Sequence, residues 1–340
     1  MGSSGRGNGA RNPATVVVLR ALQLGDLLCA VPAFRAMRRA WPSARMSLVG
    51  LPAARALTRR FEHYLDDFIE FPGYPGLPER PAEADGLPAF FDGLRARRYD
   101  LAIQMQGDGT ITNDLVARFG AAAMAGFVPP GHAPRPDGVF VEYPDGHEIR
   151  KMLALAAALG APAAGEHLEF PLSADDEREW GALRSAMALS PRGYVCLHPG
   201  ARAAARRWPP EQFARVGEAL RTRGLRVLVT GDGADEEQLA ASVVDAMQGR
   251  ATSVAGRTSL GALAALVRDA RMIVCNDTGL SHVAAAVKTP SVVIFRITDP
   301  LRWAPLDAVR HRVVHDGPGA AVAAAATALG LLEPESAHAA

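Results

Sequence analysis

Residues 272–295, MIVCNDTGLSHVAAAVKTPSVVIF, decide the fold class of this chain of 340 residues. The stretch predicts an apolar strand over 272–276, a glycine-containing turn, a helix over 280–287 and a β-branched strand over 291–295. Short apolar strands that alternate with helices are typical of a parallel α/β sheet, in which the strands are buried on both faces. The same alternation recurs through most of the chain.

The alternation occurs in two series. The first predicts strands over 15–19, 45–49, 67–71 and 99–104 and helices over 24–40, 53–61, 89–97 and 147–159. The second predicts strands over 194–197, 226–230, 272–276 and 291–295 and helices over 210–223, 235–247, 260–269 and 280–287. Pro, Ala and Gly interrupt the pattern over 160–171, where we place the connection between two domains. The prediction is an α/β protein with two Rossmann-like domains, 15–165 and 166–315, facing each other across a cleft.

The two ends of the chain and its composition exclude several classes. Residues 1–14 predict a disordered leader, and residues 316–340 an Ala-rich helix over 320–332 followed by a loose tail. A hydrophobic share of 49% and a net charge of +1 exclude a disordered chain and give no bulk attraction to nucleic acid. Three separated cysteines in apolar runs indicate reduced thiols. Without a signal peptide or an uninterrupted apolar run of about 18 residues, we expect a soluble cytoplasmic protein; work at the inner face of a membrane stays open.

Ligands of open parallel sheets bind beyond the carboxyl ends of the strands, so the residues after each strand are candidates. After the first strand, Gly25 lets the backbone approach a ligand and Asp26 places a carboxylate at this edge. The local pattern alone favours a plainer interpretation, in which Asp26 satisfies amides at a helix start. After the fourth strand, Gln104, Gln106 and Asp108 place two amides and a carboxylate, which can hydrogen-bond a polar ligand, at the same edge.

The second half offers two further loops. Gly200, Ala201 and Arg202, followed by Arg206, combine exposed backbone amides with guanidinium groups and predict a diphosphate cradle, with a solvated arginine loop as the alternative. The run Asp277–Thr278–Gly279 begins a helix and predicts an anion site, at which Asp277 binds a hydroxyl or orients a neighbour. His282 lies one turn further on the same face, where a ligand contact competes with a structural role.

Several common sites are missing from the sequence. The glycines at 231 and 233 resemble a dinucleotide turn, but Glu236 stands where the last glycine of G-x-G-x-x-G belongs. The acidic cluster over 232–236 equally suits the first turn of a helix. No D-x-D pair and no P-loop occur, which argues against a metal-held diphosphate, a kinase and a P-loop ATPase.

Together these loops resemble glycosyltransferase family 9, the ADP-heptose:lipopolysaccharide heptosyltransferase family, over about residues 16–314. The stretches that carry the resemblance are LRALQLGDLLCAVPAFRAMRRAWP, YDLAIQMQGDGTITNDLVARFGAAAMAGF, HPGARAAARRWPPEQF, AGRTSLGALAALV, CNDTGLSHVAAAVKTPSVVIF and TDPLRWAPL. The resemblance implies a GT-B fold whose first half binds the acceptor and whose second half binds the nucleotide sugar. It also implies a metal-independent, inverting transfer without a cofactor.

The resemblance further implies roles for single residues. Asp26 would be the general base, and the backbone of 200–202 with Arg206, where the family usually has lysine, would neutralise the leaving diphosphate. The donor-binding positions are Gly200, Ala201, Arg202, Arg206, Asp235 (or Asp232 if the alignment shifts), Thr258, Asp277, Thr278, Gly279 and His282. The acceptor-binding residues that we predict are Gly25, Gln104, Gln106 and Asp108.

The predicted function is transfer of heptose from ADP-heptose to a saccharide or glycolipid acceptor such as the lipopolysaccharide core. Two alternatives stay open: a GT-B enzyme that uses another nucleotide sugar, such as a UDP-sugar transferase or epimerase, and a non-catalytic nucleotide-sugar-binding protein. The partners expected are the donor and the acceptor, with no nucleic acid, and peripheral membrane association remains an option. The sequence does not give an oligomeric state.

Overall fold

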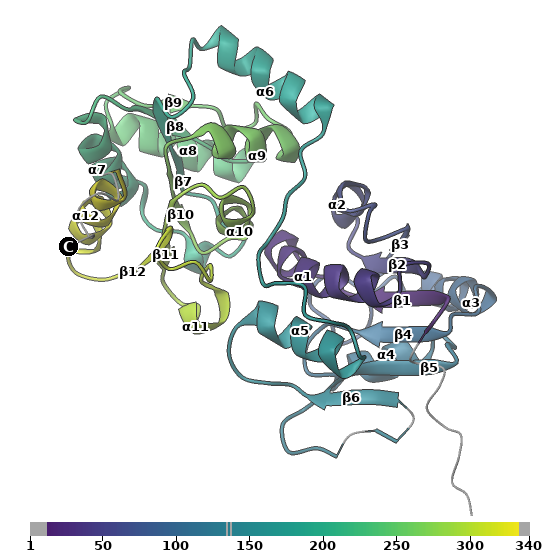
Figure 1. Cartoon of the computed structure of the whole chain (residues 1–340). Coiled ribbons are helices and arrows are strands. Elements are labelled where there is room, and N and C mark those ends of the chain that lie inside the picture. The colour runs from purple at the N-terminus through teal and green to yellow at the C-terminus, as the bar shows by residue number, and fades with distance from the viewer. Residues whose placement is uncertain (1–11, 134, 137, 333–340) are drawn as a thin grey trace, which may run out of the picture. The chain divides into compact units, whose positions relative to one another are not determined.

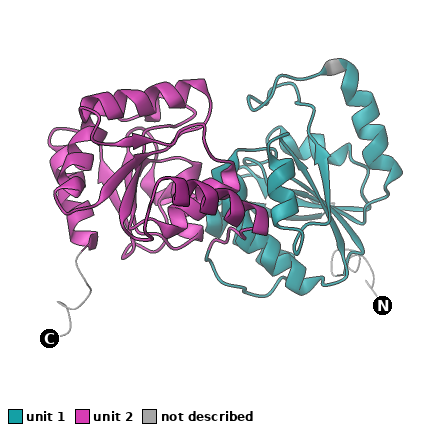
Figure 2. Cartoon of the chain, turned by 90° about the horizontal axis from the view of Figure 1, so that it is seen from above, with its two compact units in different colours: residues 1–167 teal, residues 168–340 magenta. Residues whose placement is uncertain are grey.

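The computed structural model describes residues 12–133, 135–136 and 138–332 and divides the chain into two compact units, 1–167 and 168–340 (Figure 2). Most of the predicted leader, residues 1–11, and the tail, 333–340, lie outside the described residues. Among the described residues, no helix combines the length and the apolar character that crossing a membrane requires.

Unit 1 is built on a sheet of six parallel strands in the order β3-β2-β1-β4-β5-β6 (Figure 1). The strands are β1 (Thr15–Leu19), β2 (Arg45–Gly50), β3 (Asp67–Glu70), β4 (Leu101–Gln104), β5 (Ala123–Val128) and β6 (Gly138–Glu142). The helices of this unit are α1 (Leu24–Ala40), α2 (Ala54–Arg60), α3 (Leu87–Ala96), α4 (Thr112–Ala117) and α5 (Glu148–Ala158).

Unit 2 repeats the same topology. Its sheet of six parallel strands has the order β12-β11-β10-β7-β8-β9. The strands are β7 (Tyr194–His198), β8 (Arg226–Val229), β9 (Thr252–Ser253), β10 (Ile273–Asn276), β11 (Ser291–Phe295) and β12 (His311–His315). The helices are α6 (Ala174–Ala186), α7 (Pro210–Arg221), α8 (Ala234–Ala246), α9 (Leu260–Asp269), α10 (Gly279–Ala286), α11 (Pro300–Trp303) and α12 (Ala320–Leu332).

The strand order fixes where each unit can bind a ligand. Counted within its own unit, each sheet has the order 3-2-1-4-5-6, which is the Rossmann order. Its direction of growth reverses between the first and fourth strands, so the topological switch points lie between β1 and β4 and between β7 and β10. The loops after these four strands are the loops from which most of the candidate residues come.

The central strands are buried on both faces, as a parallel sheet between helices requires. Residues 16–19 of β1 and all of β7 are buried. Alternate residues of each strand share one cluster: Val17 and Leu19 belong to the cluster of Phe91, and Val195 and Leu197 belong to the cluster of Phe213. Each such side chain contributes about 1.5–3 kcal/mol when it leaves water, so these clusters supply most of the stability of the two units.

All the predicted strands and helices are present, with ends that agree to within two residues, and the bounds of β1, α1, α9, β11 and α12 agree fully. The prediction missed α4, β5, β6, α6, β9, α11 and β12. The strand β5 reads AMAGFV, and Ala and Gly have low strand propensity, so its pattern does not predict a strand. The strand β9 has two residues, which is too short for any periodicity.

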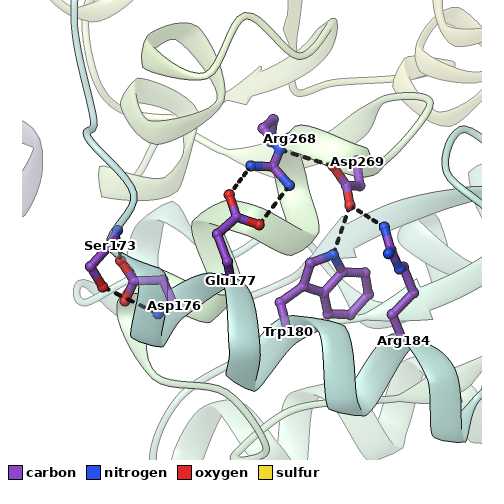
Figure 3. Close-up of polar contacts among 7 residues, drawn as sticks. All are labelled: Ser173, Asp176, Glu177, Trp180, Arg184, Arg268 and Asp269. Atoms are coloured by element: carbon purple, nitrogen blue, oxygen red, sulfur yellow. Dashed lines mark hydrogen bonds and ion pairs between the residues drawn. The ribbon is translucent and has the colours of Figure 1, made fainter.

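The helix α6 shows how an element without an apolar face is held (Figure 3). It begins with a capping box, in which the Ser173 hydroxyl accepts from the Asp176 amide (3.2 Å) and the Asp176 carboxylate accepts from the Ser173 amide (2.7 Å). Its indole at Trp180 and its guanidinium at Arg184 both donate to the Asp269 carboxylate at the end of α9, each over 2.9 Å. Polar contacts around the buried Trp180 therefore hold α6 against α9. Because the helix has little apolar surface, hydrophobic periodicity does not predict it.

One buried histidine makes the stability of unit 2 depend on pH. His311 on β12 is 4% exposed, with its Nδ1 2.9 Å from the Ser291 hydroxyl, and burial lowers its pKa to about 4. The folded state therefore binds this proton more weakly than the unfolded state. The stabilisation is complete above about pH 6.5 and is lost as the pH falls from there towards 4, by about 3 kcal/mol in all.

Urea unfolding of the wild type and of His311→Gln between pH 4 and 7 measures this effect. The variant is expected to show a flatter dependence of the unfolding free energy on pH over that window. His315, which is exposed on the same strand, provides the matched control, and His315→Gln should keep the wild-type slope. Equal slopes for His311→Gln and the wild type would contradict the prediction.

Candidate active site

In unit 2, one buried amide ties together the loops at the switch point. Asn276, the last residue of β10, donates through Nδ2 to the Pro199 carbonyl (2.8 Å) and accepts through Oδ1 from the Trp208 amide (3.0 Å). The loop after β7 and the turn before α7 are thus fixed relative to β10. We did not predict Asn276 as a site residue, although an amide side chain at the last position of a central strand is a signal for such a bridge.

Beside this bridge, a cation lies against a buried carboxylate. The Arg206 guanidinium is 38% exposed and stands 3.6 Å from the Asp277 carboxylate, which is buried. The same carboxylate accepts from the Thr298 hydroxyl over 2.6 Å. Burial raises the pKa of Asp277, and the Thr298 hydrogen bond and Arg206 oppose that rise. The structure therefore brings together the cation and the acid of two separately predicted loops.

The third feature is the start of α10. Its N-cap, Thr278, makes no side-chain capping bond, and its carbonyl accepts from the amide (3.0 Å) and the hydroxyl (2.7 Å) of Ser281. The amides at Gly279 and Leu280 belong to the first turn, where a helix favours anions. His282 is buried further along, with its ring 6.4 Å from that of Trp303 in an edge-to-face arrangement, so it has a packing role as well.

The acidic residues after β8 divide into one that faces the site loops and one that does not. The predicted Asp235 has a side chain that is 83% exposed and lies 3.9 Å from Arg207. Its neighbour Glu236 instead packs against Gly200, where an added Cβ would fall 2.3 Å from the Glu236 carboxyl carbon. The Glu236 carboxylate also accepts from the Asp232 amide (3.0 Å) and lies 3.9 Å from Nε2 of His198. The sequence analysis selected Asp235, and not Glu236, as a donor-binding residue.

Burial of His198 completes this corner of the site. Its Nδ1 is 3.1 Å from the Thr230 hydroxyl, and burial lowers its pKa, so the neutral imidazole predominates near pH 7. The loop of the predicted Thr258 is attached nearby, because the Gly256 amide donates to the Gly231 carbonyl over 3.0 Å. Thr258 itself is partly buried.

The arginines after β7 have different surroundings. Arg207 donates to the Ala201 carbonyl over 2.7 Å and so holds the loop itself. Arg296 supports the same segment by donating to the Arg207 carbonyl over 2.7 Å. Arg202 is exposed, which leaves open the solvated alternative for its side chain. Arg206 lies against the buried carboxylate of Asp277, whereas the carboxylate beside Arg207, that of Asp235, is exposed.

In unit 1, the predicted base lies in the first turn of α1. Gly25 and Asp26 are partly buried, and the N-cap of the helix, Gln23, makes no side-chain capping bond. The Asp26 carbonyl accepts from Nε of Arg20 over 2.8 Å. The Gln106 side chain reaches the same loop, since its Oε1 accepts from the Ala21 amide over 2.8 Å. The switch point of unit 1 thus joins the loops of Asp26 and Gln106.

The three predicted acceptor residues at and after the end of β4 differ in what they can offer. Gln104 is fully buried; its amide nitrogen donates to Thr112 (2.6 Å) and its oxygen accepts from the Phe127 amide (3.0 Å), so it holds the loop. Gln106 is also buried, and its Nε2 makes no hydrogen bond among the described residues. Asp108 is partly exposed and accepts from the amide of Thr110 over 2.9 Å.

The part of the chain that the structure describes contains no cluster of three or more His, Cys, Asp or Glu residues able to hold a metal ion. The sequence likewise lacks a D-x-D pair. The prediction of a metal-independent reaction stays a prediction.

The fold defines a class, the proteins with two Rossmann-like domains, and comparisons with known proteins give the family. The sequence model of "Glycosyltransferase family 9 (heptosyltransferase)" matches residues 88–322. Lipopolysaccharide heptosyltransferase 3 of Escherichia coli K12 is 23% identical over 290 residues, 83% of this chain and 82% of that protein. The chain belongs to glycosyltransferase family 9 and is a glycosyltransferase.

Solved structures agree with this assignment. A family 9 glycosyl transferase from Veillonella parvula superposes with a TM-score of 0.75 at 19% identity, over 89% of this chain and 88% of that one. The ADP-heptose lipopolysaccharide heptosyltransferase II of E. coli gives a TM-score of 0.72 at 21% identity, over 94% and 98%. These likenesses span both units and confirm the predicted GT-B class.

Proposed function

We propose that this glycosyltransferase moves a heptose from ADP-heptose to a saccharide or glycolipid acceptor such as the lipopolysaccharide core, by an inverting and metal-independent displacement. The relatives named above support the donor and the acceptor class. The observation that carries the proposal is the Arg206 guanidinium, held 3.6 Å from Asp277 next to the first turn of α10. A cation beside a helix N-terminus suits a leaving diphosphate.

Unit 2 is the proposed donor domain. Arg206 and the amides of the loop 200–202 would neutralise the diphosphate, and the amides at Gly279 and Leu280, with the Thr278 hydroxyl, would add to them. Thr258 and His282 complete the proposed contacts. Asp277 would accept from a sugar hydroxyl or orient Arg206. The packing of Glu236 on Gly200 favours Glu236 over its neighbour Asp235 for a nucleoside or sugar hydroxyl.

Unit 1 is the proposed acceptor domain. Gly25 and Asp26 lie in the first turn of α1, the helix that follows β1, and Gln106 and Asp108 follow β4 at the same switch point. Asp108 and the Nε2 group of Gln106 would hydrogen-bond acceptor oxygens. Gln104 would act indirectly, because its buried amide fixes the loop that carries the other two.

In the proposed reaction, Asp26 accepts the proton of the acceptor hydroxyl as that oxygen attacks the anomeric carbon. The new carbon–oxygen bond forms while the bond from the anomeric carbon to the β-phosphate oxygen breaks. ADP leaves with the electron pair of that bond, and its added charge is met by Arg206 and the helix amides. Attack from the face opposite the leaving group inverts the configuration.

A thermal-shift panel of ADP, GDP, UDP, dTDP and NAD tests the donor, because a ligand that binds only the folded state raises the melting temperature. At about 100 times Kd the stabilisation is about 2.7 kcal/mol, so a selective shift with ADP is expected. A preference for UDP, GDP or dTDP would keep the enzyme class and reject ADP-heptose. A shift with NAD alone would reject the proposal. ADP release from ADP-heptose that requires core-truncated lipopolysaccharide would separate a transferase from a hydrolase, an epimerase or a non-catalytic binder.

A further inference from the structure

Arg20, the residue that follows β1, is among the most deeply buried charged side chains in unit 1, with 0% exposure. A guanidinium is seldom fully buried unless each of its donors finds an acceptor. Its counter-charge is Glu148, the first residue of α5, whose carboxylate lies 3.2 Å from one terminal nitrogen of Arg20. Both charges are therefore buried in the interior of the unit, and the pair is not an ordinary surface ion pair.

The donors of Arg20 reach three separate segments. Its Nε donates to the carbonyl of Asp26 in the first turn of α1 (2.8 Å). One terminal nitrogen donates to the carbonyl of Met105 after β4 (2.5 Å), and the other donates to Glu148 on α5 (3.2 Å). The planar guanidinium fixes the directions of these donors relative to one another, so the three segments are held in one geometry.

The hydrogen bond from Arg20 to the Asp26 carbonyl is not required to form the helix α1. Within an α-helix, a first-turn carbonyl already accepts from the amide four residues further on. Arg20 therefore adds a second donor to a carbonyl that the helix can satisfy, which orients the turn and does not rescue an unpaired group. The bond from the Ala21 amide to Gln106 ties the same two loops together a second time.

We infer that Arg20 is a positioning residue for sugar transfer: its guanidinium, neutralised by Glu148, holds the turn of Asp26 against the loop after β4 and so places the Asp26 carboxylate for proton transfer. This inference rests on the proposed role of Asp26 as base. A displacement of about 1 Å at a catalytic group can cost about 100-fold in rate, so the position of Asp26 matters even though Arg20 acts only through the backbone of its turn.

A double-mutant cycle between Arg20 and Asp26 tests the inference, with ADP release from ADP-heptose and core-truncated lipopolysaccharide as the assay. Arg20→Lys keeps the charge beside Glu148 but has one donor centre in place of the fork. It is expected to lower kcat by about 10- to 100-fold. The KM for the donor should change less than about twofold, because the proposed donor residues belong to unit 2. In the Asp26→Asn background, Arg20→Lys should change the residual kcat by less than about twofold.

Arg38→Lys is the matched control. The Arg38 side chain is 17% exposed and also combines backbone carbonyls with one carboxylate, donating to Ala44 (2.6 Å), Tyr64 (2.8 Å) and Asp66 (2.6 Å). These partners lie away from the turn of Asp26. Arg38→Lys is expected to lower the melting temperature without changing kcat and without coupling to Asp26.

A second variant guards against loss of folding. Arg20→Met combined with Glu148→Gln removes both charges of the pair, so that neither is left in the interior without the other. It should lose kcat as Arg20→Lys does and should keep the thermal shift with ADP. An equal loss of kcat from Arg20→Lys in the wild-type and Asp26→Asn backgrounds would overturn the inference for Arg20 alone. If Asp26→Asn keeps the wild-type kcat, the proposed base is wrong and the positioning role is overturned with it.

Discussion

Replacement of Asp26 by asparagine is expected to lower kcat for sugar transfer by about 100- to 10,000-fold, the range in which general bases act. The variant keeps the size of the side chain but has no basic oxygen for the acceptor proton. The fold should persist, because an acidic residue in the first turn of a helix contributes only about 0.3–1 kcal/mol through the helix dipole. ADP release from ADP-heptose and core-truncated lipopolysaccharide measures the rate, and thermal unfolding measures the fold.

The control separates catalysis from helix stabilisation. Asp114 is also an acidic residue in the first turn of a helix of unit 1, α4, and its side chain is 83% exposed. Asp114→Asn should cost a few tenths of a kcal/mol in stability and leave kcat unchanged. If Asp26→Asn behaves like Asp114→Asn, the carboxylate of Asp26 serves the helix start and the proposed base is wrong.

The sequence predicts the elements whose burial produces a simple pattern. The strand β1 is a continuous apolar run, and α1 follows it with apolar residues at helical spacing and a stop before Trp41 and Pro42. The strand β5 has no such pattern because one of its residues must be small. At Gly126, a Cβ would lie 2.8 Å from the Cβ of Gln104, so packing against the buried amide requires glycine and weakens the strand signal.

The loops of the site follow from topology, but the directions of their side chains do not. The residues after β1, β4, β7 and β10 are accessible to prediction because a parallel sheet places ligands beyond these strand ends. Asp235 and Glu236 are adjacent on α8, about 100° apart around the helix axis. Glu236 faces the loop after β7 because Gly200 has no side chain and leaves room for the Glu236 carboxylate. This contact joins residues that are far apart in the sequence.

Asn276 illustrates the same limit. Its role depends on the carbonyl of Pro199 and the amide of Trp208, which the fold brings together from distant parts of the chain. A sequence pattern places the amide at the end of a strand but cannot give these partners. The capping box at Ser173, by contrast, is local, so the start of α6 was within reach of sequence reasoning.

Removal of the cation at Arg206 is expected to have the second large effect. Arg206→Gln should lower kcat by about 100- to 1,000-fold, because a charge that meets the leaving diphosphate acts in the transition state. The loss has a second source in Asp277. Without Arg206, the negative charge of ionised Asp277 is no longer neutralised and opposes the departing diphosphate; loss of the cation also raises the pKa of this buried carboxyl further, which reduces that charge as the pH falls.

Arg206→Lys distinguishes charge from fork geometry. The family usually has lysine at this position, so Arg206→Lys should keep kcat within about tenfold of the wild type. A bidentate hydrogen bond to two phosphate oxygens would be lost in this variant, because lysine lacks the guanidinium fork. Arg221→Gln, which removes an exposed cation paired with Glu218 at 3.0 Å on α7, should leave kcat unchanged. If Arg206→Gln raises KM and keeps kcat, the cation binds ground and transition states equally, and the diphosphate-stabilising role is wrong.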